Sequence, residues 1–285
     1  MCACRFSLII ATVERTSAVE RLLASLSAQT FLDFEVIVVD QNDDGRLEGI
    51  LRAWSDQMTL KHLRSARGLS RARNAGLRAA CGEIIAFPDD DCWYPPDLLR
   101  ELDRWFRQHD EYSFLSTCAI TGDGNRTAGR WLARSTEIRR GNVFRTHVSF
   151  SLFFRVNAVR VAGGFDEALG LGSDTPHGSA EETDYVLRLL EHGSRGWYES
   201  ALTVFHPAPS PTDSLERETS RAYSYGMGFG YVLRRHRMPF VLSLYLCIRP
   251  AGGWLWNITH DRRSSAISLA TLRGRLLGYF RSQES

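Results

Sequence analysis

Apolar runs alternate with amphipathic segments along the first half of the chain. Four short segments are expected to be strands, at residues 6–11, 35–39, 60–63 and 84–87. Apart from 60–63, which contains Lys61 and His62, they are almost wholly apolar, as expected for strands buried on both faces of a sheet. Segments with helical spacing follow them, at 16–26, 47–54, 70–80 and after Pro95-Pro96. This alternation predicts an α/β fold in which a mixed, mainly parallel sheet is flanked by helices.

The second half of the chain has a less regular pattern. Apolar runs predict strands at 114–120, 148–154 and 197–205, and a helix is expected at 180–191. Helical segments then follow at 215–237 and 267–280, with no internal repeat. We therefore expect one sheet-containing domain followed by a helical C-terminal extension.

The composition is that of an ordinary globular protein, with 44% hydrophobic and 24% charged residues, which excludes a disordered or collagen-like chain. The six cysteines show no C-x-x-C pairing, so we expect reduced thiols and no structural zinc. The longest apolar stretch, 238–258, is interrupted by Arg249-Pro250. We expect no signal peptide, no membrane span and a cytoplasmic location.

Charge is distributed unevenly along the chain. The net charge is +2, but residues 216–285 hold eleven arginines against four acidic residues, which gives +7 and leaves −5 for the rest. This basic segment also carries Trp254 and Trp256 beside apolar stretches. Arginine beside tryptophan suits a helix on an anionic membrane surface, whereas the alternative is a packing or dimer contact.

Polar side chains follow the predicted parallel strands at the edge where such sheets bind ligands. Asp89, Asp90 and Asp91 follow the fourth strand. In an extended segment Asp89 and Asp91 point to one side and Asp90 to the other. Carboxylate oxygens are suitable ligands for Mg²⁺ or Mn²⁺, so a metal site is one interpretation and a solvated acidic turn is the other.

Dinucleotide-dependent oxidoreductases and P-loop NTPases are disfavoured, because neither a G-x-G-x-x-G nor a G-x-x-x-x-G-K-[ST] loop follows the first strand. That position reads A-T-V-E-R-T, which includes Thr12 and Glu14. A nucleotide bound here would need a cation to neutralise its diphosphate.

The segment RGLSRARNAGLRAACGEIIAFPDDDCWYPP, residues 67–96, resembles the centre of glycosyltransferase family 2. The opening strand and helix, the V-V-D strand end, the GGFDEAL segment and the AEETDYVLRLLEHG segment are similar to the same family, in the same order. The resemblance covers about residues 5–206 and implies a GT-A fold. It divides the chain into residues 1–210, with a nucleotide-binding half (1–110) and an acceptor half (111–210), and the helical extension 211–285.

The resemblance implies a metal-dependent, inverting transfer of a sugar from a nucleotide diphosphate. Asp91 would be the main ligand of Mn²⁺ or Mg²⁺. Asp89 would either be a second ligand or support the ligands without touching the ion. His206 in VFHP would complete the metal site. Asp90 would contact the donor ribose. The remaining donor-binding positions are Thr12, Glu14, Asp40, Gln41, Arg67 and Arg73.

The chain departs from the family at the pair Asp40-Gln41. Many members have two acids where this chain has Asp40-Gln41, which leaves the nucleotide base open. Arg67 and Arg73 would brace the nucleotide or the aspartates, although Arg73 could also be an ordinary solvated helix arginine.

The catalytic base implied by the resemblance is Glu182. A carboxylate within hydrogen-bond reach of the acceptor hydroxyl can take its proton as that hydroxyl attacks the anomeric carbon. Glu181 and Asp184 are alternatives, and all three could instead only favour a helix N-terminus.

We expect the acceptor to be a glycan or a lipid-linked glycan of surface polysaccharide synthesis, with the enzyme peripheral on the inner face of the cytoplasmic membrane. The alternative functions are a sugar nucleotidyltransferase, whose glycine-rich signature is absent, and a non-enzymatic nucleotide-binding module. We do not expect nucleic acid as a partner, because the first 215 residues are net acidic.

Overall fold

A computed structural model describes residues 4–208 and 214–281, so the boundary expected at residues 210–211 lies outside the described residues. The chain forms two compact units. The first comprises Met1–Arg67, Arg71–Gly164 and Val186–Pro209, and the second Gly68–Ser70, Phe165–Tyr185 and Ser210–Ser285. The domain boundaries expected at residues 110 and 210 remain predictions.

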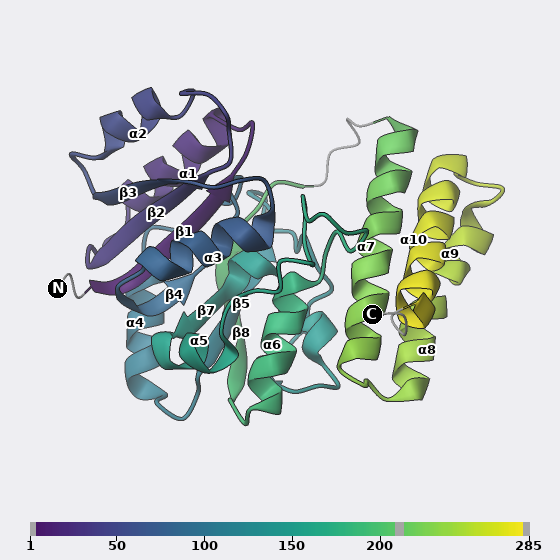
Figure 1. The fold of residues 1–285 in the computed structure, drawn as a ribbon. Helices are drawn as coiled ribbons and strands as arrows, with labels where there is room; N and C mark the ends of the chain where they lie inside the picture. Colours follow the sequence, from purple (N-terminus) through teal and green to yellow (C-terminus); the bar gives the residue numbers. More distant parts are fainter. Residues whose placement is uncertain (1–3, 209–213, 282–285) are drawn as a thin grey trace. The chain divides into compact units, whose positions relative to one another are not determined.

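The first unit is built on an eight-stranded sheet with the order β3-β2-β1-β4-β7-β5-β8-β6 (Figure 1). Its strands are β1 (Cys4–Thr12), β2 (Phe34–Asp40), β3 (Thr59–Arg64), β4 (Gly82–Ala86), β5 (Phe114–Ile120), β6 (Thr136–Ile138), β7 (Leu152–Arg155) and β8 (Gly196–Phe205). The pairs β1–β2, β2–β3, β1–β4 and β5–β8 are parallel, whereas β7 is antiparallel to β4 and β5. The α/β prediction of a mixed, mainly parallel sheet is confirmed.

Strand burial follows directly from the apolar runs. All seven residues of β2 are buried, as are Phe6, Leu8, Ile9 and Ile10 of β1. A strand this apolar needs helices on both faces, and these are α1 (Ser17–Ser27), α2 (Glu48–Trp54), α3 (Leu69–Ala79), α4 (Leu98–Gln108) and α5 (Val156–Ala162). Figure 1 shows α3 and α5 in front of the sheet.

Helix α3 approaches the sheet closely because it carries Gly76. A Cβ atom at this position would lie 2.3 Å from Cγ2 of Ile9 in β1. Strand order also reverses at β1, since β2 lies on one side of it and β4 on the other. This reversal is the topological switch point at which α/β sheets bind ligands beyond the carboxyl ends of their strands.

The second half of the sheet was predicted less well. The strand expected at 148–154 begins only at Leu152, because Ser149–Ser151 forms a 3₁₀ turn in which the Ser151 hydroxyl accepts from the Val148 backbone N–H. The short strand β6 and helix α5 were not predicted. Three residues are too few for an alternation signal, and α5 has only two buried residues.

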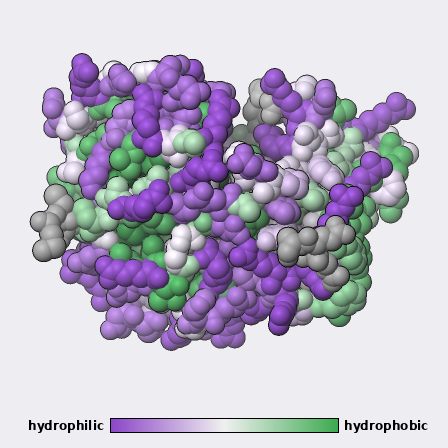
Figure 2. Space-filling view, viewed as in Figure 1, coloured by the Kyte–Doolittle hydropathy of each residue, from purple (hydrophilic) through white to green (hydrophobic). Residues whose placement is uncertain are grey.

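The second unit contains α7 (Leu215–Arg235), α8 (Phe240–Ile248), α9 (Pro250–Asn257) and α10 (Arg262–Arg281). Helix α6 (Glu181–Glu191) starts in this unit. Glycines let α7 and α10 approach closely: a Cβ at Gly230 would lie 2.1 Å from the Arg275 carbonyl, and one at Gly278 2.1 Å from that of Met227. Figure 2 shows hydrophobic residues over α8. Among the described helices, none combines the length and apolar character that crossing a bilayer takes.

Candidate active site

Asp89, Asp90 and Asp91 follow β4 in the first unit, and a β-bridge fixes their position. The Trp93 N–H donates to the Phe205 carbonyl at 3.0 Å, and the Phe205 N–H donates back at 2.9 Å. The two rings stack with centroids 5.4 Å apart. This bridge ties the acidic run to the end of β8, where His206 follows Phe205.

The bridge brings Asp89, Asp91 and His206 together. Each offers one ligand atom, and these atoms all lie within 4.8 Å of one another. His206 Nε2 lies 3.2 Å from Asp91 Oδ1. Its other ring nitrogen, Nδ1, lies 2.8 Å from the Pro207 carbonyl, so Nδ1 donates and Nε2 is left to accept a proton or a metal ion.

The donor set of this cluster fits a divalent cation. Ligands on opposite sides of an octahedral Mg²⁺ or Mn²⁺ are about 4.2 Å apart, close to the spread of the three atoms. Two carboxylate oxygens and one imidazole nitrogen suit Mn²⁺ somewhat better than Mg²⁺, which prefers oxygen alone. The residues present could therefore hold the ion that the sequence predicts, with positions left for other oxygens.

Arginines compensate the negative charge of the cluster. Arg73 Nη2 lies 3.2 Å from Asp89 Oδ1, and the Ser149 hydroxyl lies 3.3 Å from the same oxygen. Arg73 is only 2% exposed, so it is a buried partner of Asp89 and not a solvated helix arginine. Arg15 contacts both Asp90, at 2.9 Å, and Asp91.

Asp90 differs in surroundings from Asp89 and Asp91. Because β4 ends at Ala86 and the Cys92 N–H donates to the Asp89 carbonyl at 3.1 Å, the three side chains are oriented by a turn and not by an extended strand. Asp90 accepts from the Thr12 hydroxyl at 2.7 Å, and burial raises its pKa to about 6 although Arg15 and Thr12 oppose this shift. Burial also raises the pKa of Asp91, but hydrogen bonds and charge from His206 and Arg15 outweigh burial and lower this pKa to about 2. Burial lowers the His206 pKa, and the Asp91 carboxylate more than offsets this and raises it.

A second group of residues surrounds Asp40 at the end of β2. Asp40 is fully buried and accepts from Asn42, through its backbone N–H at 2.9 Å and its side-chain amide at 2.7 Å. His62 Nε2 and Arg64 Nη1 approach the other oxygen at 3.1 and 2.9 Å. Gln41 is 6% exposed, and its N–H donates to the Thr12 carbonyl at 3.0 Å.

His62 and Arg64 were missed as site residues. They lie two apart on β3, where the strand register pairs Arg64 with Asp40. A signal was available in the sequence, because His62 and Arg64 are polar residues two apart on a predicted strand and so lie on one side of it. The neighbouring strand ends at Asp40, which makes them candidates for the same site. Arg15 and Ser149 were missed for a different reason, because their contacts with the aspartates depend on the fold and not on spacing.

Glu14 and Arg67 form a separate exposed ion pair in the first unit. Arg67 Nη2 lies 2.5 Å from Glu14 Oε1, and both side chains are more than 60% exposed. Glu14 has φ of 59°, and its N–H donates to the Asn42 side chain at 2.7 Å. Arg67 thus pairs with Glu14, whereas Arg73 and Arg15 are arginines that contact the aspartates.

Three acidic residues in the second unit begin α6. Glu181 is 5% exposed and Asp184 is fully buried, and Asp184 lies 2.9 Å from His236 Nε2 and 3.5 Å from Arg235 Nε. Glu182 is intermediate in burial, so it is the most accessible of the three. A base must reach solvent or substrate, and this difference favours Glu182 over its neighbours.

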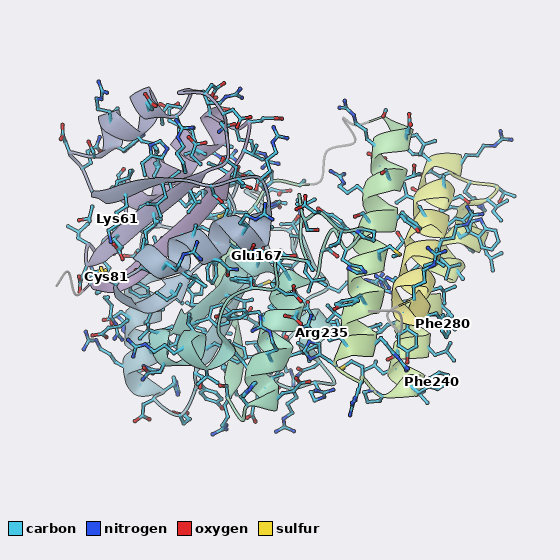
Figure 3. All side chains as sticks on the ribbon, in the orientation of Figure 1. Lys61, Cys81, Glu167, Arg235, Phe240 and Phe280 are labelled. Atoms are coloured by element: carbon cyan, nitrogen blue, oxygen red, sulfur yellow. The ribbon has the colours of Figure 1, made fainter. Side chains whose placement is uncertain are left out.

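A further cluster lies at the opposite, amino-terminal edge of the sheet. Cys4, Glu35 and Cys81 bring their ligand atoms within 4.8 Å of one another, and Lys61 Nζ lies 2.7 Å from Glu35 Oε2 (Figure 3). Burial and the Glu35 carboxylate raise the pKa of Cys4 to about 12. The Lys61 ammonium already neutralises the carboxylate, and the thiols are held protonated, so this group is not a good cation site.

Comparisons with known proteins identify the family of this chain. The family described as glycosyl transferase family 2 matches residues 7–159. An uncharacterized glycosyltransferase of Haemophilus influenzae is 25% identical over 77% of this chain and 74% of its own length. The GalNAc(5)-diNAcBac-PP-undecaprenol beta-1,3-glucosyltransferase of Campylobacter jejuni is 26% identical over 52% of this chain and 50% of its own length.

Solved structures share the fold. The mannosyltransferase PcManGT from Pyrobaculum calidifontis, in complex with GDP-Man and Mn²⁺, superposes with a TM-score of 0.69 at 16% identity, over 98% of this chain and 88% of that one. This confirms the GT-A fold. Because the family match covers more than half of the sequence, the chain belongs to glycosyl transferase family 2 and is a glycosyltransferase.

Proposed function

We propose that this enzyme transfers a sugar, with inversion, from a nucleoside diphosphate sugar to a glycan or lipid-linked acceptor, and that it depends on Mn²⁺ or Mg²⁺. The observation that carries the proposal is the convergence of Asp89, Asp91 and His206, whose ligand atoms lie within 4.8 Å of one another beyond the carboxyl end of the sheet. These residues would hold the cation. When bound, it would neutralise the diphosphate and the charge that grows on it as the sugar leaves.

The donor nucleoside would lie along the ends of β1 and β2. Asp90, which is oriented by Thr12 and Arg15, would accept hydrogen bonds from the ribose hydroxyls. Asp40 has its carboxylate occupied by Asn42, His62 and Arg64. Asp40 and Gln41 would therefore form a rigid edge against the base, with Glu14 and Arg67 at its exposed rim.

Glu182 would remove the proton from the acceptor hydroxyl. It stands in the first turn of α6, and it is more accessible than Glu181 and Asp184. Asp184 already has His236 and Arg235 as close neighbours, so its role would be to hold α6 in place. A single carboxylate base and one displacement produce inversion at the anomeric carbon.

The acceptor proposal is supported by the relatives. The Campylobacter protein is named for an undecaprenyl-diphosphate-linked acceptor, and this chain covers half of its length. We propose a comparable glycan or lipid-linked acceptor in surface polysaccharide synthesis, reached at the inner face of the cytoplasmic membrane.

Donor hydrolysis tests the proposal. The purified protein is incubated with UDP- and GDP-sugars, with Mn²⁺ or with EDTA, and released nucleoside diphosphate is measured. Release that requires the cation supports the proposal. Release that is unchanged by EDTA would show that the reaction does not need the cation. Turnover to pyrophosphate or nucleoside triphosphate would indicate a nucleotidyltransferase.

A further inference from the structure

Helix α8 exposes its apolar residues and buries its small ones. Ser243 and Cys247, four residues apart, are each only 1% exposed. The Ser243 hydroxyl donates to the Met238 carbonyl at 3.3 Å, and Cys247 Sγ lies 3.8 Å from the Arg275 carbonyl in α10. A surface helix of a soluble domain normally turns its apolar side inward, so α8 has the reverse arrangement.

The residues that α8 turns outward, together with Trp256 of α9, are exposed apolar side chains. The α8–α9 face is defined by Phe240, Val241, Leu244, Tyr245, Ile248 and Trp256. Val241 is 79% and Trp256 72% exposed, and α9 has no buried residue at all. Figure 2 shows the hydrophobic colour over α8, and Figure 3 labels Phe240 at its start. A patch of this kind on a soluble protein marks an interaction site.

Basic residues flank α8 in the sequence, and the nearest acidic residue on the C-terminal side is Asp261, beyond the end of α9. Residues 219–260 contain no aspartate or glutamate but include five arginines. Arg237 is exposed immediately before α8, and Arg249 separates α8 from α9. The face is therefore apolar in the middle and cationic at both ends of α8, while Tyr245 and Trp256 are the residue types that favour a membrane–water interface.

We propose that the α8–α9 face binds the surface of a membrane that contains anionic phospholipids, with its apolar side chains between the headgroups. Arginines beside an exposed apolar helix suit this partner, because lipid phosphates meet the cations while the acyl region accepts the side chains. A second copy of the chain is less suitable. A two-fold contact would bring the face against itself and set Arg237 and Arg249 near their own copies. The proposal goes beyond sugar transfer, which does not itself require this face.

Vesicle binding tests the proposal. The full chain is sedimented with vesicles of about three parts phosphatidylcholine to one part phosphatidylglycerol, and with vesicles of phosphatidylcholine alone. We expect binding to the anionic vesicles that weakens with added salt, and little binding to the neutral ones. The double variant Val241→Ser/Leu244→Ser should lose at least about tenfold in partitioning, because two exposed apolar side chains are removed from the bound surface.

The matched control is Leu32→Ser, which removes a side chain that is 75% exposed in the first unit. It should bind vesicles as the parent does. Equal binding by the double variant, or no binding by the parent, would overturn the proposal. A concentration-dependent dimer that the double variant abolishes, without vesicle binding, would assign the face to a second copy. Nucleoside diphosphate release by the same preparations separates failure of this proposal from failure of the proposed transferase.

Discussion

The glycine contacts between α7 and α10 allow a quantitative prediction for Gly230→Ala. A Cβ at Gly230 would lie 2.1 Å from the Arg275 carbonyl oxygen and 2.7 Å from the Tyr279 nitrogen. Ordinary contact begins at 3.4 Å, so α7 and α10 would have to separate by about 1.3 Å at this point. Both obstacles are backbone atoms, which cannot rotate away as a flexible side chain can.

The expected cost follows from two opposing terms. Overpacking of a rigid contact costs about 3 kcal/mol, at the upper end of its usual range, whereas alanine in a helix gains about 0.5–1 kcal/mol over glycine. The net loss of about 2 kcal/mol corresponds to a melting temperature roughly 4–8 °C lower. Circular dichroism at 222 nm and calorimetry on the full chain would measure it.

Gly252→Ala is the matched control. Gly252 also lies inside a helix, α9, but a Cβ there meets nothing within 4 Å. This variant should be unchanged or more stable by about 0.5–1 kcal/mol. If Gly230→Ala proved as stable as Gly252→Ala, the close approach of α7 and α10 would be refuted.

Three further substitutions probe charge and catalysis. Lys61→Met leaves the buried Glu35 carboxylate without its ammonium partner, so the free energy of unfolding in urea should fall by about 1–3 kcal/mol, a range that is discounted for the partial exposure of Lys61. Lys61→Arg should recover most of this stability. An unchanged urea midpoint for Lys61→Met would contradict the pairing. Burial lowers the His147 pKa from 6.5 to about 4, so the unfolded chain binds the proton first. Stability should therefore fall as pH drops from about 6.5 to about 4, by at most about 3 kcal/mol. His147→Phe should flatten that part of the stability–pH profile, and a profile for His147→Phe that runs parallel to that of the parent would argue against a buried neutral ring. Glu182→Gln should keep donor affinity in titration calorimetry and lose at least about a hundredfold in transfer, whereas transfer at the parent rate would place the base elsewhere.

The sequence predicted the first half of the fold because its signals are local. The strands β1, β2 and β4 are short apolar runs, and each needs only its own composition and a following amphipathic segment to be recognised, whereas β3 is half polar and was expected from its place between two helical segments. The 3₁₀ turn at Ser149–Ser151 was not recognisable in this way. There the Ser151 hydroxyl accepts from the Val148 backbone N–H, and the alternation of apolar residues and serines that predicts a strand continues through the turn.

In the candidate site, too, local signals could be predicted from the sequence and contacts between distant segments could not. The acidic run Asp89–Asp91 could be recognised as a candidate site because it follows an apolar strand, but the turn that orients its side chains could not be predicted from extended-strand alternation. Arg15 and Ser149 reach Asp90 and Asp89 only because distant segments pack together. The reversed polarity of α8 was also hidden, since a uniformly apolar sequence does not reveal which side faces the protein.

The most direct test of the central claim is the Mn²⁺ dependence of nucleoside diphosphate binding, measured by titration calorimetry for the parent, Asp91→Asn and the control Glu83→Gln. Glu83 is an exposed residue of β4 that pairs with Arg5. The account predicts that the parent and Glu83→Gln bind the nucleotide much more tightly with Mn²⁺ than with EDTA, and that Asp91→Asn loses this difference. The same Mn²⁺-dependent affinity in Asp91→Asn would contradict the account.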